Sequence, residues 1–137
     1  MNVLLYAFRR ESPRHSSYAE WLKRVMVGHE PVGLSELVLS AVVRLATFHR
    51  IYREPSSTEE TLQFCRTLRN APAAISLRPG PRHWAIFETL CRDGNATANL
   101  VPAAYHAALA IENDATWITN DRGFARFPLL QWRLPFA

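Results

Sequence analysis

Short apolar runs alternate along the chain with longer segments in which apolar residues recur at helical spacing. The segment Asn2–Phe8 is apolar and continuous, which is typical of a strand buried on both faces of a sheet. Similar short runs predict further strands over 31–35, 74–77, 115–119 and 129–136. Apolar residues three and four positions apart predict helices over 11–28, 36–48, 58–71, 82–94 and 102–114.

Residues that favour a helix start support two of these boundaries in particular. Ser12 followed by Pro13 predicts the N-cap and first turn of the first helix. Ser57 and Glu60 have the spacing of a capping box at the start of a later helix.

The order of the predicted elements is β-α-β-α-α-β-α-α-β-α-β, and it favours one α/β domain over residues 1–137. Strands that alternate with helices predict a mostly parallel central sheet covered by helices on both faces. In such sheets ligands bind beyond the carboxyl ends of the strands. Three positions are expected to gather there: the helix start at Ser35 and Glu36, the helix start at Pro102, and the turn Thr119–Asp121.

Composition and charge narrow the classes of protein. The 137 residues are 48% hydrophobic, which excludes a disordered chain, and no apolar run approaches the roughly 18 residues of a membrane span. The absence of a secretory signal and of a cysteine framework predicts a cytoplasmic protein. Sixteen basic residues against 12 acidic ones give a net charge of +4, and Lys23 is the sole lysine. Arginine excess indicates either phosphate recognition or the bias of a GC-rich genome.

Two carboxylates stand out once common motifs are excluded. The chain has no GxGxxG, GxxxxGK[ST] or GxSxG motif, and its two cysteines do not make a zinc site. Asp121 follows an apolar strand and Glu36 opens a helix beyond another strand, so together they could bind a divalent cation through oxygen. Their alternative roles are local: Asp121 as the N-cap of a turn, and Glu36 as a first-turn acid that stabilises the helix dipole.

Five segments resemble, in the same order, those of PIN-domain ribonuclease toxins from VapBC toxin–antitoxin systems, in their actinobacterial branch. They are NVLLYAFR (2–9), GLSELVLSAVVRLAT (33–47), PGPRHWAIFETL (79–90), NLVPAAYHAALAIEN (99–113) and ITNDRGFARFPLLQW (118–132). The resemblance implies a PIN-like three-layer α/β/α sandwich. It also implies an enzyme that cuts RNA with the help of Mg²⁺ or Mn²⁺, and tRNA and rRNA are candidate substrates. It also implies a VapB-like antitoxin as partner, a homodimer and no membrane association.

The resemblance carries over residue by residue, with two departures. Family members begin with an Asp two positions before the residue matching Asn2, which would fall just before Met1, so either the start codon lies upstream or this ligand is missing. Glu36 and Asp121 match acidic ligand positions, whereas Ala103 stands where a metal-binding Asp is usual. Supporting positions are Asn2, Ser35, Arg44, Thr119 and Asn120, and weaker RNA phosphate contacts are assigned to Arg9 and Arg10.

Two other hypotheses remain open from the sequence. Because alanine cannot coordinate a metal, Ala103 and the missing first Asp are also compatible with a catalytically degenerate PIN domain that binds antitoxin or RNA without cutting. The third hypothesis is a small doubly wound signalling or scaffold domain. In that case Glu36, Ala103 and Asp121 are not expected to converge.

Overall fold

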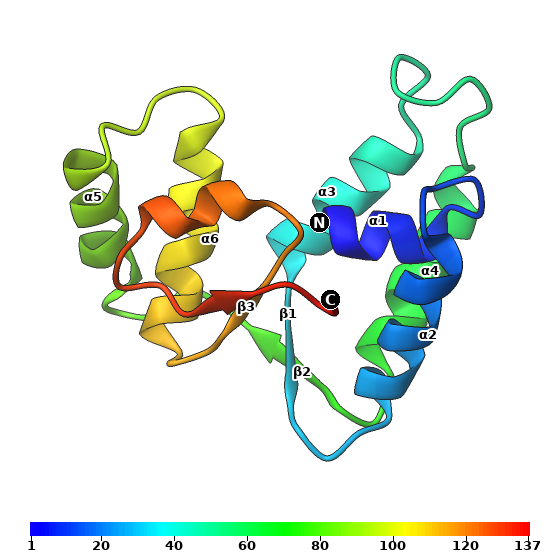
Figure 1. Cartoon of the computed structure of the whole chain (residues 1–137), viewed down its shortest axis with the longest axis horizontal. Coiled ribbons are helices and arrows are strands. Elements are labelled where there is room, and N and C mark those ends of the chain that lie inside the picture. The colour runs from blue at the N-terminus through cyan, green and yellow to red at the C-terminus, as the bar shows by residue number, and fades with distance from the viewer. The chain divides into compact units, whose positions relative to one another are not determined.

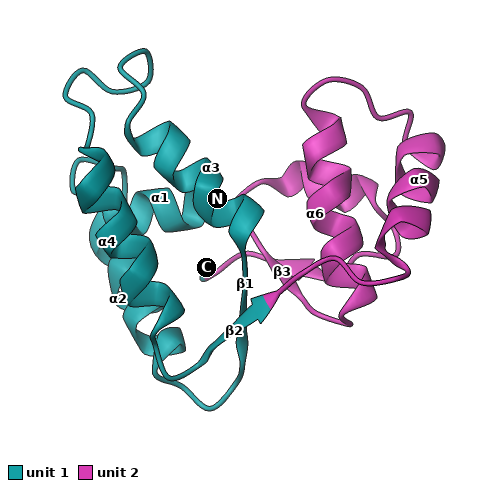
Figure 2. Ribbon diagram, turned by 180° about the vertical axis from the view of Figure 1, so that it is seen from behind, with its two compact units in different colours: residues 1–76, 136 teal, residues 77–135, 137 magenta.

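The computed structural model describes residues 1–137, which divide into two compact units (Figure 2). The first comprises residues 1–76 with Phe136, and the second residues 77–135 with Ala137. Along the chain (Figure 1) the elements are α1 Asn2–Phe8, α2 His15–Met26, β1 Val32–Ser35, α3 Glu36–Ala46, α4 Thr58–Arg69, β2 Ala74–Leu77, α5 His83–Asp93, α6 Leu100–Glu112, β3 Trp117–Ile118, the 3-10 helix η1 Arg122–Arg126 and β4 Trp132–Arg133. None of the helices has the length and apolar character that crossing a bilayer requires.

The prediction of a strand over residues 2–8 is wrong, because this segment is the helix α1. Main-chain bonds from the N–H of Leu5 to the carbonyl of Met1, and from the N–H of Arg9 to the carbonyl of Leu5, close helical turns. Four of its side chains are buried, and a short apolar run of this kind fits a buried helix as well as a buried strand. Leucine and alanine, which are strong helix formers, favour the helix.

The first unit is built from α1 to α4. Helix α1 packs on α2 and α3, and α3 also packs on α4. Val42 of α3 and Thr61 of α4 are completely buried in this core. Ser57 caps α4 as predicted, since its Oγ accepts a hydrogen bond from the N–H of Glu60 at 3.1 Å. The predicted cap at Ser12 is wrong: α2 begins at His15, after Arg14 in the left-handed conformation with φ of 59°.

The second unit is built on the packed pair α5 and α6. Helix α6 is rich in alanine, so it buries much of its surface at close approach, and Phe124 and Phe127 around η1 complete the same core. Strands β3 and β4 are parallel, with Trp117 opposite Trp132 and Ile118 opposite Arg133. This strand–turn–strand arrangement positions the turn that contains Asp121.

The α/β class with parallel strands is confirmed, but the hydrogen-bonded strands form two pairs, β1 with β2 and β3 with β4, instead of one continuous sheet. Residues 2–8 are helical and contribute no strand, and β3 and β4 span only two residues each. That residues 1–137 act as a single domain stays a prediction.

Candidate active site

Glu36 is the first residue of α3, immediately after β1. Ser35 ends the strand in an extended conformation, and its Oγ accepts a hydrogen bond from the N–H of Val38, so Ser35 is the N-cap of α3 and the predicted helix start at Ser35 or Glu36 is confirmed. The Glu36 carboxylate is exposed, and its Oε2 lies 3.5 Å from a guanidinium nitrogen of Arg69, the last residue of α4. The cap therefore fixes the main chain next to Glu36, while the Glu36 carboxylate itself stays exposed to solvent.

Asp121 lies at the carboxyl end of β3 and caps η1. Its Oδ1 accepts a hydrogen bond from the N–H of Gly123 at 2.8 Å, and its own N–H donates to Oγ1 of Thr119 at 3.0 Å. Thr119 is buried and is held to β4 through a bond from its N–H to the carbonyl of Arg133. Asp121 is thus both the N-cap and an exposed acid beyond a strand, with Oδ2 free for a ligand.

Ala103 lies in the first turns of α6, half-buried against the core of the second unit. Further along this helix, His106 is buried, and burial lowers the pKa of its imidazole to about 4. His106 is therefore neutral near pH 7, which excludes it as a cationic phosphate contact. Glu36 belongs to one unit, and Ala103, Asp121 and the half-buried Asn120 belong to the other, so their convergence stays a prediction.

The predicted basic and polar positions of the first unit have different environments. Arg9 is 9% exposed, and its guanidinium is occupied by protein groups, donating to Oγ of Ser56 at 2.7 Å. Arg10 is exposed. Arg44 is also exposed, eight residues after Glu36 and so about 12 Å along the helix axis. Asn2 lines a cavity beside α1. Of the two weak RNA contacts, Arg10 alone is accessible.

The acidic residues match the donor chemistry of Mg²⁺ without forming a complete protein cage. No group of three or more His, Cys, Asp or Glu side chains is arranged to hold a metal ion. Mg²⁺ is commonly held by one or two carboxylates, while water and substrate phosphates fill its other positions. Glu36 and Asp121 each present an exposed carboxylate, which is the kind of oxygen donor that Mg²⁺ takes.

The pairing of Arg69 with Glu36 is a site feature that sequence reasoning missed. Arg69 lies 33 positions from Glu36, and the signal available was an arginine in the last turn of a helix. Such an arginine is ordinarily explained by the helix dipole. Its contact with an acid near the start of another helix depends on how α3 and α4 pack.

Comparison with known proteins places the whole chain among one group of sequences. Residues 1–130 match the family model described as PIN domain. The chain is 44% identical to VapC ribonuclease Mb2897 of Mycobacterium bovis over 98% of its length and 92% of that protein. It is 35% identical to ribonuclease VapC31 of Mycobacterium tuberculosis, covering 92% of this chain and 89% of the relative.

A likeness in fold accompanies the likeness in sequence. A chain in the crystal structure of VapBC2 from Rickettsia felis, bound to a DNA fragment from its promoter, matches with a TM-score of 0.68. The match covers 97% of this chain and 93% of that chain, at 18% sequence identity. It therefore supports the arrangement of the elements.

Proposed function

The chain belongs to the PIN-domain family and, within it, to the VapC group, and on that premise we propose that it is an endoribonuclease toxin. Its substrate is RNA, whose phosphodiester bonds it hydrolyses with Mg²⁺ or Mn²⁺. The likeness to VapC ribonucleases over nearly the whole chain carries this proposal. The exposed acid Asp121, held by its neighbours at the end of β3, adds a chemical reason.

Glu36 and Asp121 are the carboxylates that we assign to the cation. Metal ions of this kind activate water for attack on a phosphodiester and offset the charge of the scissile phosphate. Hydrogen bonds with Thr119 and Gly123 hold Asp121 so that its Oδ2 stays available for the cation. The Ser35 cap fixes the main chain at the start of α3, where Glu36 lies. Asn120 and Arg44 are supporting residues in this proposal, and Ala103 occupies the position of a lost ligand.

The proposed partner is a VapB-like antitoxin, because a structural neighbour of this chain comes from a VapBC structure. The protein acts as a homodimer in the cytoplasm, where both RNA and antitoxin are found. These parts of the proposal rest on family membership.

Ala103 favours a second candidate function, a PIN domain that binds RNA or antitoxin without cleavage. Losing one of several oxygen ligands weakens the hold on Mg²⁺. Restoring the carboxylate with Ala103→Asp distinguishes the two functions. The half-buried position of Ala103 requires that folding of this variant be checked by circular dichroism.

The deciding experiment measures cleavage of single-stranded RNA by the purified chain in Mn²⁺, in Mg²⁺ and in EDTA. The proposed function predicts cleavage that depends on the cation in the unaltered protein. Cleavage by Ala103→Asp alone supports the binding module. If neither protein cleaves RNA or binds Mn²⁺, the enzymatic proposal is wrong.

A further inference from the structure

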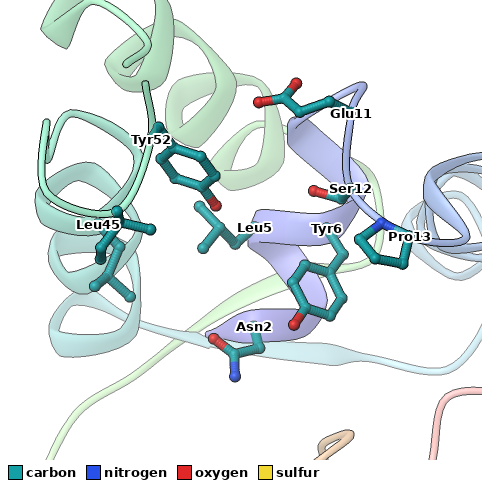
Figure 3. Close-up of a pocket in the computed structure, with 9 residues that line it drawn as sticks. Asn2, Leu5, Tyr6, Glu11, Ser12, Pro13, Leu45 and Tyr52 are labelled. Atoms are coloured by element: carbon teal, nitrogen blue, oxygen red, sulfur yellow. The ribbon is translucent and has the colours of Figure 1, made fainter. Parts of the chain in front are cut away.

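A cavity of about 340 Å³ lies in the first unit, between α1, the turn that follows it and the loop after α3. Tyr6 and Tyr52 lie on either side of Leu5 in this cavity (Figure 3), so two aromatic rings and an aliphatic side chain form its walls. Asn2 and Ser12 add polar groups that can donate and accept hydrogen bonds. The cavity is thus apolar in its walls and polar at a few points, as small-ligand sites are.

Arg9 holds one wall of this cavity in place. Its guanidinium carbon lies 3.9 Å from the centre of the Tyr52 ring, and its NH2 donates to the carbonyl of Glu54 at 2.9 Å. The guanidinium also makes a hydrogen bond to Ser56 and an ion pair with Glu11. Arg9 therefore acts as a positioning residue that fixes the loop, and its charge offsets that of Glu11 at the cavity.

The same loop presents unpaired positive charge next to the cavity. Arg50 and Arg53 are exposed and make no hydrogen bond or ion pair, and they flank Ile51 and Tyr52, which line the cavity. Within residues 48–53 there is no acidic residue. A ligand of this surface therefore combines a planar or apolar group for the cavity with negative charge on its two sides.

We propose that the cavity is a subsite for an unstacked base of single-stranded RNA, with Arg50 and Arg53 on the flanking phosphates. Proteins that bind single strands stack bases on aromatic side chains and track the backbone with basic residues. The cavity volume is near the lower end of small-ligand sites, which suits one base. This inference rests on the proposed function, because it assigns residues that hold part of the RNA substrate.

The first test measures binding of fluorescein-labelled single-stranded RNA homopolymers by anisotropy, with EDTA present so that no cleavage occurs. The double variant R50Q/R53Q is expected to bind all of them more weakly. It should also flatten the dependence of log K on log salt by about 1.4, because two phosphate contacts are lost. The matched control K23Q/R24Q removes two exposed charges from the last turn of α2 and should leave the salt slope unchanged.

The second test concerns the cavity itself. Tyr6→Phe and Asn2→Ala remove polar atoms from the lining while leaving both aromatic rings in place. The proposal predicts that they reduce the differences in affinity among the poly(A), poly(C), poly(G) and poly(U) probes, without altering the salt slope. Unchanged discrimination in both variants means that no base enters the cavity.

The outcomes separate this inference from the proposed function. If the wild type binds RNA and R50Q/R53Q binds it equally well, or no more weakly than K23Q/R24Q does, the loop does not hold RNA and the subsite is wrong. Metal-dependent cleavage by the wild type then still upholds the proposed function. If the wild type binds no RNA in EDTA, the subsite is wrong, and the cleavage assay in Mn²⁺ alone decides the proposed function.

Discussion

His106 makes the stability of the protein depend on pH in a way that one substitution removes. The side chain is 3% exposed on α6, its ring stacks on Trp117 with centroids 5.2 Å apart, and its Nδ1 is buried without a hydrogen-bond partner. Burial lowers the pKa of the imidazole from 6.5 to about 4, because a charged ring loses its solvation there. The folded protein therefore binds the proton more weakly than the unfolded chain does.

The change in unfolding free energy with pH follows from this difference in the pKa of His106 between the folded and unfolded states. Above pH 6.5 His106 is neutral in both states and the effect on stability is absent. As the pH falls from 6.5 to about 4, the unfolded chain takes up the proton first, so the free energy of unfolding falls by about 3 kcal/mol. Below about pH 4 both states are protonated, and the loss from this group is complete.

The assay compares urea unfolding of the wild type and His106→Leu at closely spaced pH values between 7.5 and 4. Carboxylates that titrate in this range are common to both proteins, so the difference in unfolding free energy reports His106. We expect that difference to change by about 3 kcal/mol in favour of the variant at the acidic end. His29→Leu, at an exposed position, is the matched control and should follow the wild type. Parallel pH curves for wild type and His106→Leu, or an NMR titration of His106 near pH 6.5, would refute the reasoning.

Two further predictions concern each unit in turn. Val42→Ala removes two methyl groups from a fully buried site and should lower the unfolding free energy by about 2 kcal/mol in urea titrations, whereas Val27→Ala, at a side chain 68% exposed, should change it little. In the second unit, the Glu112 carboxylate accepts hydrogen bonds from the N–H groups of Gly80 and Arg82, which lower its pKa. Glu112→Gln should therefore lower the Tm at pH 7, with a difference from wild type that shrinks as the pH falls below 4.5, and a difference independent of pH would contradict this.

The parts of the fold that the sequence predicted are those decided by neighbouring residues. Ser57 caps α4 as predicted, and α3 begins at the predicted place with Ser35 as its cap, because a cap needs only the N–H groups two or three positions later. Residues 74–77 form the expected strand for a similarly local reason, a short apolar run between turns. The prediction of a strand over residues 2–8 is wrong because the apolar pattern of this segment does not distinguish a buried strand from a buried helix.

In the candidate site, too, the features that could be predicted are those set by residues adjacent in the sequence. The place of Asp121, beyond a strand and at the start of a turn, could be predicted because strand and turn adjoin in sequence. The buried network of Arg9 could not, since its partners Glu54 and Ser56 lie 45 and 47 positions away and meet it only in the packed unit. The significance of Ala103 came from the family resemblance, because an alanine in a helix carries no chemical signal of its own.

The most direct test of the central claim is the rate of RNA cleavage in Mn²⁺ by Asp121→Asn relative to the wild type. Asparagine can still accept the hydrogen bond from Gly123 and cap η1, so the turn is kept while the charge is lost. The matched control is Asp114→Asn, at an exposed residue with φ of 51°, a conformation that asparagine tolerates. We predict a loss on the order of 100-fold for Asp121→Asn, about 3 kcal/mol of transition-state stabilisation, and none for the control. Equal cleavage rates for Asp121→Asn and the wild type would contradict the account.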